Sequence, residues 1–157
     1  MSPLISPTGP LATVLILAHV GVGIVGYGTN ALVGWDAWEL ARGGRVERRF
    51  LDGTVTPAEL ALLWVPLLGG LLVALVDPEA LGQAWFLVAW ALWCLSAAVA
   101  LAVAWPTQRR LGRLLDDAPS SANEVRALAR RLLRAEQLIV VCYVVAFWLM
   151  VLKPGNR

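Results

Sequence analysis

Four long runs of apolar residues dominate the chain, and the charged residues gather between them. A helix needs about 20 apolar residues to cross the hydrocarbon core of a bilayer. Four segments reach that length, at residues 11–35, 57–76, 81–105 and 132–152. The pattern therefore predicts an all-α, polytopic four-helix membrane bundle that forms a single transmembrane domain. Two longer connections, at about residues 36–56 and 106–131, are predicted to be cytoplasmic loops.

Several boundaries carry helix start and stop residues. TPAE at 56–59 and SANE at 121–124 have the spacing of capping boxes, in which the first and fourth residues exchange hydrogen bonds with each other's backbone. The short Asp77-Pro78 turn predicts that spans two and three form an antiparallel hairpin. Pro106 marks the end of span three or a kink near it, because proline cannot donate a helical hydrogen bond.

Composition supports a membrane protein. The chain is 59% hydrophobic and 15% charged, whereas soluble domains are about 45–50% apolar and about 25% charged. The N-terminal segment has no basic residue, so we expect the first run to be a retained span and not a cleaved signal peptide. Span four carries Arg134 and Glu136 in its first turns, and both side chains are expected to extend toward the lipid headgroups.

Charge placement predicts the orientation of the spans. The first and third connections contain eleven of the thirteen basic residues, and the C-terminal tail contains the other two, Lys153 and Arg157. Basic residues accumulate in cytoplasmic loops of membrane proteins. Both termini are therefore predicted to lie on the outer side of the membrane.

The stretch AHVGVGIVGYGTN at 18–30 contains GVGIVG, which matches the dinucleotide-binding pattern G-x-G-x-x-G. That pattern requires a strand–turn–helix context, and here it lies within a predicted membrane span. Helical spacing gives a better interpretation, because His19, Gly23, Gly26 and Asn30 fall on one stripe of the helix. Small residues let another helix approach closely, so we expect this stripe to face the bundle or a partner protein.

His19 is the single histidine of the chain, and it lies within a span. An ionisable residue inside the membrane suggests a function. Three roles remain open: an axial haem ligand, a titrating group in a proton or substrate path, or a hydrogen-bonding group in helix packing. Trp90 and Trp93 lie deep in span three and either pack or form the wall of a ligand or quinone pocket. Pro66 and Gly69-Gly70 predict a kink in span two.

No clustered catalytic or metal-binding pattern is present in the sequence. Cys94 and Cys142 are isolated in apolar runs and form no C-x-x-C pair. With His19 they would form a soft Cu(I) site only if the fold brought them together, and buried cysteines are more commonly apolar packing residues. We therefore predict no catalytic residues, no metal site and no nucleic-acid partner.

Six arginines of the third connection are candidates for docking. Arg126, Arg130 and Arg134 recur every four residues and share one helix face. This face is predicted to contact anionic lipid headgroups or, alternatively, an acidic partner. The full candidate set is Arg109, Arg110, Arg113, Arg126, Arg130 and Arg134.

Three segments, LILAHVGVGIVGYG, WPTQRRLGRL and FWLMVLKPG, together resemble the DUF2269 family of small bacterial four-helix membrane proteins. The resemblance covers most of the chain. It implies a multi-pass protein of the bacterial inner membrane, and it implies no established reaction.

The sequence favours a non-enzymatic role, as an accessory or assembly subunit that packs against a larger membrane complex or against itself. Two alternatives are a haem-binding or quinone-linked redox membrane protein that uses His19 as ligand, and a transporter of a small solute or metal ion. No cofactor is required by the first hypothesis, and haem is the cofactor implied by the second.

Overall fold

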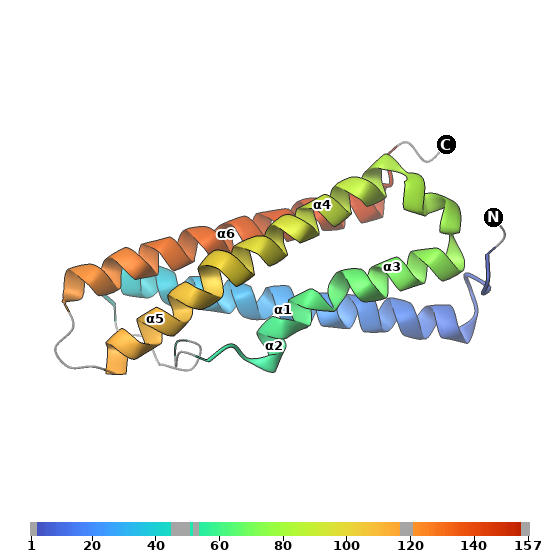
Figure 1. The fold of residues 1–157 in the computed structure, drawn as a ribbon. Coiled ribbons are helices and arrows are strands. Elements are labelled where there is room, and N and C mark those ends of the chain that lie inside the picture. Colours follow the sequence, from blue (N-terminus) through green and yellow to red (C-terminus); the bar gives the residue numbers. More distant parts are fainter. Residues whose placement is uncertain (1–2, 45–50, 52–53, 117–120, 155–157) are drawn as a thin grey trace.

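The computed structural model describes residues 3–44, 51, 54–116 and 121–154, and every regular element in those ranges is helical (Figure 1). Arg45, Arg48, Arg49 and Arg157, which contribute to the charge asymmetry, lie outside the described residues. The elements are α1 (Pro10–Ala41), α2 (Pro57–Leu60), η1 (Ala61–Leu63), α3 (Val65–Val76), η2 (Pro78–Gly82), α4 (Ala84–Val99), the π-helical η3 (Ala100–Ala104), α5 (Trp105–Asp116) and α6 (Ala122–Leu152).

These elements join into four rods that are long and apolar enough to cross a membrane, at Pro10–Ala41, Pro57–Val76, Ala84–Asp116 and Ala122–Leu152. The prediction of an all-helical fold with four helices able to span a membrane is confirmed. Large apolar side chains cover the outside of the bundle, including Val14, Leu17 and Ile24 on α1. Such a surface is suited to lipid and unsuited to water.

Helices α1 and α6 form the centre of the bundle. Helix α1 packs against α6 on one side and α3 on another, while α4 packs against α6. Figure 1 shows α3 and α4 leaving their shared turn in different directions, α3 along α1 and α4 along α6. Residues of all four helical rods line a cavity near the end of the bundle where α1 begins and α6 ends.

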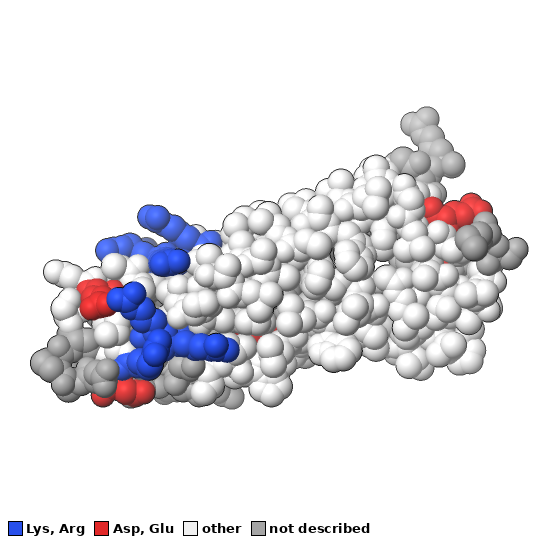
Figure 2. All heavy atoms as spheres, viewed as in Figure 1, with Lys and Arg blue, Asp and Glu red and all other residues white. Residues whose placement is uncertain are grey.

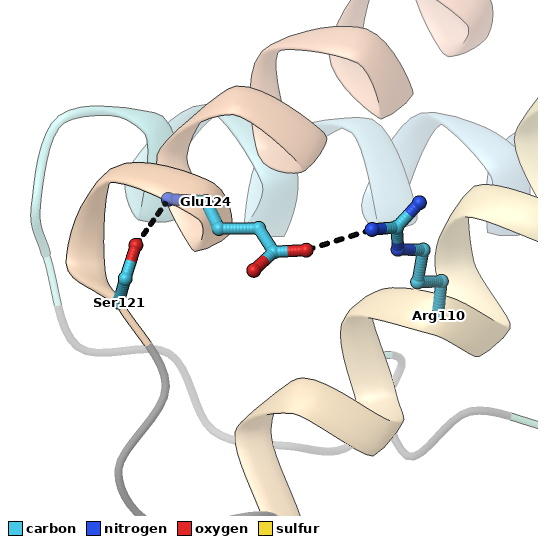
Figure 3. Close-up of polar contacts among 3 residues, drawn as sticks. All are labelled: Arg110, Ser121 and Glu124. Carbon is cyan, nitrogen blue, oxygen red and sulfur yellow. Dashed lines mark hydrogen bonds and ion pairs between the residues drawn. The ribbon is translucent and has the colours of Figure 1, made fainter.

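The two predicted capping boxes differ in how completely they form. At Thr56 the capping box is complete: the Glu59 N–H donates to Thr56 Oγ1 at 3.2 Å, and the Thr56 N–H donates to Glu59 Oε2 at 2.6 Å. At Ser121 only half of the box forms. The Glu124 N–H donates to Ser121 Oγ at 3.2 Å, but the Glu124 carboxylate pairs with Arg110 at 2.7 Å (Figure 3).

The helical rods extend beyond the apolar runs, into the end of the molecule that carries the arginines. This end is called the basic end. The third rod continues through Pro106 to Asp116, with a π-helical turn that ends two positions before the proline. A π-turn alters the hydrogen-bond ladder locally, which accommodates a residue that cannot donate. The fourth helix begins at Ala122, ten residues before the predicted span, so most of the described part of the third connection is helical.

Candidate functional site: the His19 cavity

His19 points from α1 to the backbone of α3. Its Nδ1 lies 2.9 Å from the carbonyl oxygen of Val65. A carbonyl oxygen only accepts hydrogen bonds, so Nδ1 carries the proton and Nε2 keeps its lone pair. This bond fixes the tautomer and the orientation of the imidazole, and it leaves Nε2 as the nitrogen that can accept a proton donor or bind a metal.

Gly69 on α3 makes room for the imidazole. A Cβ atom at this position would lie 2.7 Å from His19 Cε1, which is closer than real Cβ contacts allow. At the neighbouring Gly70 a Cβ would meet Trp90 Cζ2 at 3.5 Å, an ordinary contact. The predicted kink residues of span two thus have separate structural roles, and Gly69 is the one that accommodates His19.

The second rod changes helical type just before this point. It contains the 3₁₀ turn Ala61–Leu63 between α2 and α3. Pro66 has no N–H to donate to the carbonyl of Leu62, which lies four residues earlier. The indole Nε1 of Trp93, on α4, donates to that oxygen at 3.1 Å instead. Trp93 therefore supplies from another helix the donor that the proline removes.

The predicted stripe on α1 lies inside the bundle and divides into two parts. Gly26 packs against the second rod so closely that a Cβ would lie 2.5 Å from Leu62 N. Asn30 is fully buried and donates through Nδ2 to the Gly26 carbonyl at 2.7 Å. Gly23 is buried beside open space, with no atom within 4 Å of an added Cβ. Gly26 thus mediates helix packing, whereas His19 and Gly23 border a cavity.

This cavity has a volume of about 420 Å³ and is lined by residues of all four rods. Its walls are mostly apolar and include several aromatic side chains. Tyr27 and Tyr143 stack with ring centroids 4.2 Å apart, and Trp90 and Trp93 meet edge to face at 5.5 Å. Trp85, Phe86 and Phe147 complete the aromatic part of the lining. The arrangement can hold a flat, apolar molecule and offers it few polar groups, of which His19 is one.

Met150 and Lys153 line the same cavity as His19. The Lys153 Nζ lies 5.7 Å from the centre of a Trp85 ring, so a cation is available at this end of the cavity. No sequence pattern connects Met150 with His19, because 131 positions separate them in the chain. The two cysteines that could act as soft metal ligands lie in different environments. Cys94 is exposed on the outside of the bundle, and Cys142 is buried. Within the described ranges, no three His, Cys, Asp or Glu side chains gather as metal ligands would.

The expectation that the Glu136 side chain extends to the lipid headgroups is wrong. Its exposed fraction is 1%, and its Cβ lies 3.0 Å from where a Cβ on Gly34 would be. The fully buried Glu59 is near enough for the two carboxyls to interact electrostatically. Neither Glu136 oxygen has a hydrogen-bond partner among the described residues. Sequence reasoning missed this buried acidic pair.

The six candidate docking arginines do not form one surface. Figure 2 shows the basic side chains gathered at one end of the molecule. There Arg110 pairs with Glu124, and the Arg126 guanidinium lies against Gly43. Arg109 and Arg113 are exposed on α5. Arg130 and Arg134 instead line a groove beside α4 and η3.

A family model described as "Predicted integral membrane protein (DUF2269)" matches residues 11–154. No curated protein and no solved structure matches the chain.

Proposed function

The chain belongs to the DUF2269 family of predicted integral membrane proteins, and from that premise we propose that it binds a flat, lipid-soluble ring compound of the quinone and quinol class in the His19 cavity. The observation that carries the proposal is the hydrogen bond from His19 Nδ1 to Val65, because it presents Nε2 as an acceptor in an aromatic chamber. A quinol hydroxyl is a donor that matches this nitrogen.

The shape and lining of the cavity support a ring compound. Small-molecule sites are typically about 300–1,000 Å³, largely apolar, with a few placed polar groups. Trp90, Trp93 and Phe86 offer faces and edges on which a ring can stack. The surrounding helices are apolar outside, so a ligand dissolved in the bilayer can reach the bundle without crossing water.

Haem is the second candidate, and Met150 is the observation that favours it. His19 and Met150 line one cavity, and a histidine with a methionine is a known axial pair for haem iron. The Nδ1–H bond to a backbone carbonyl is the usual support for a metal-bound imidazole. Haem bound in this way would supply one-electron chemistry. In that case His19 and Met150 would be the residues that hold the iron, and Lys153 would supply a positive charge for a propionate.

We further propose a bacterial inner-membrane location with both termini outside. The start of α1 and the end of α6 lie at the same end of the bundle, opposite the basic end (Figures 1 and 2). The basic end would face the cytoplasm.

The accessory-subunit hypothesis and the transporter hypothesis have less support. The small-residue stripe that suggested a partner protein packs within this chain, since Gly26 contacts Leu62. A transport path from His19 to Asn30 would have to pass that contact. An accessory role is still compatible with a ligand-binding bundle, and it stays a prediction.

Two matched glycine variants test the proposal. Gly23→Leu fills the cavity, whereas Gly21→Leu places the same side chain on the exposed face of α1; neither glycine has an atom within 4 Å of an added Cβ. The purified full chain is titrated under anaerobic conditions with menadiol, the quinol form of menadione, and quenching of tryptophan fluorescence is measured. We expect saturable quenching for wild type and Gly21→Leu, and its loss in Gly23→Leu. Equal quenching in all three proteins would refute the quinone-class ligand.

An absorbance spectrum of the same preparation tests the haem candidate. Haem supplied to the purified protein should give a Soret band that is lost in Met150→Leu and His19→Gln. A Soret band unaffected by either variant, or no band at all, would remove haem from consideration.

A further inference from the structure

A second hollow lies at the basic end, on the outside of the bundle. It is an open groove of about 540 Å³ between the α4–η3 segment and α6. Three arginines of α6, Arg130, Arg131 and Arg134, line it together with the apolar residues Val99, Val103 and Leu138. It is separate from the His19 cavity and shares no lining residue with it.

The three guanidinium groups have no counter-ion within the described part of the chain. No salt bridge or hydrogen bond from their side chains is found among those residues, whereas the nearby Arg110 pairs with Glu124 at 2.7 Å (Figure 3). All three arginines are exposed. The groove thus combines apolar walls with unpaired positive charge.

The arginines and Leu138 occupy different positions along the α6 side of the groove. On α6 the arginines precede Leu138, so they lie nearer the basic end, and Arg130 is about 12 Å from Leu138 along the helix axis. On the facing segment Val103 lies nearer the basic end and Val99 nearer the middle of the rod. A molecule that follows this groove must be anionic at one end and apolar at the other.

We propose that the groove holds one anionic phospholipid from the leaflet at the basic end, with its phosphate between the arginines and an acyl chain along Val99, Val103 and Leu138. Arginine matches phosphate oxygens geometrically as well as electrostatically. A free anion would leave the apolar strip unused. A peptide would bring backbone polar groups to a depth where lipid offers them no partner.

The groove also changes the predicted docking set. It includes Arg131, which the face defined by Arg126, Arg130 and Arg134 omits. It excludes Arg109 and Arg113 of α5, which are exposed elsewhere on the basic end. These two residues therefore provide a matched control of equal chemistry.

The experiment is native mass spectrometry of the full chain released from mild detergent. The protein is incubated with equal amounts of phosphatidylglycerol and phosphatidylcholine of the same chain length. We expect one phosphatidylglycerol per chain to be retained in preference to phosphatidylcholine. A surface arginine contributes about fivefold to the affinity for anionic lipid, so Arg130→Gln/Arg131→Gln/Arg134→Gln should lower the preference by roughly a hundredfold.

The control Arg109→Gln/Arg113→Gln should keep the preference of the wild type. An equal loss in this control, or no loss in the triple variant, would overturn the groove as the site. Glycerol phosphate at millimolar concentration should not displace the lipid, and displacement would show a phosphate site in place of a lipid site. The substituted side chains are exposed, and circular dichroism confirms that each variant remains helical.

Discussion

Trp93 donates its indole N–H to the carbonyl oxygen of Leu62, 3.1 Å away on a different rod. Pro66 explains why this oxygen needs an outside donor, since the residue four positions later in a helix would normally supply one. The bond ties α4 to the 3₁₀ turn of the second rod at the inner end of the His19 cavity. Trp93 therefore lines the cavity, and it also stabilises the second rod at the point where its α-helix is interrupted.

A double-mutant cycle tests this relationship. Trp93→Phe removes the donor and should lower the free energy of unfolding by about 1 kcal/mol, the usual worth of a neutral hydrogen bond. Pro66→Ala restores a backbone donor for Leu62, so in that background Trp93→Phe should cost little. Unfolding in detergent gives the four values. A coupling energy near zero would show that the two residues act independently.

Gly26 is predicted to be intolerant of any side chain, because a Cβ there would overlap Leu62 N at 2.5 Å. Gly26→Ala should destabilise the protein by about 1–3 kcal/mol, as overpacking generally does. Gly28→Ala is the matched control, since Gly28 is exposed with no neighbouring atom within 4 Å of an added Cβ. It should be neutral or slightly stabilising in a helix. Thermal unfolding of both variants checks the difference, and equal midpoints would contradict the close approach of α1 and the second rod.

The helical rods could be predicted because hydropathy alone determines where a chain can cross a bilayer. The capping box at Thr56 could be predicted because its donors and acceptors are local. The stripe from His19 to Asn30 is also a local periodic feature of α1. What packs against each residue of this stripe depends on other parts of the chain. Gly26 meets Leu62, while Gly23 meets empty space, and nothing in their shared spacing distinguishes them.

The burial of Glu136 could have been predicted from helical spacing, although hydropathy alone does not indicate it. On α6 the buried residues include Leu132, Ala135, Ile139 and Cys142, and Glu136 falls on the same face by helical spacing. Arg134 falls on the opposite, exposed side. The expectation that both side chains extend to the headgroups rested on their position near the end of the span. It did not include the fact that they lie on opposite sides of the helix. The facing Gly34, one helical turn after Asn30, continues the stripe and accommodates the glutamate.

Gly69 is predicted to control the position of His19. Gly69→Ala would place a Cβ 2.7 Å from Cε1 of the imidazole and should displace the ring from Val65. Gly70→Ala introduces only an ordinary contact with Trp90 and is the control. The nitrogen NMR shifts of His19 report the tautomer, so wild type and Gly70→Ala should show a protonated Nδ1 and an unprotonated Nε2. Gly69→Ala should lose this fixed tautomer and weaken menadiol binding about tenfold, the cost of about 1.4 kcal/mol. An unchanged spectrum in Gly69→Ala would mean that the imidazole is not held by Val65.

Glu136→Gln is predicted to stabilise the protein. The wild-type carboxyl is buried beside Glu59 with no hydrogen-bond partner in the described part of the chain, and an unpartnered buried acid is costly. Glutamine keeps the shape, removes the ionisable group and abolishes the repulsion from Glu59, so the free energy of unfolding should rise by about 1–2 kcal/mol.

Glu124→Gln is the control for that variant. Glu124 makes an exposed pair with Arg110, and exposed pairs contribute about 0–1 kcal/mol, so its loss should be neutral or slightly destabilising. Thermal unfolding at pH 7 measures both variants. If Glu136→Gln were instead destabilising by more than the control, the carboxylate would have a stabilising partner, and a buried acid pair without a counter-charge would be the wrong description of this part of the bundle.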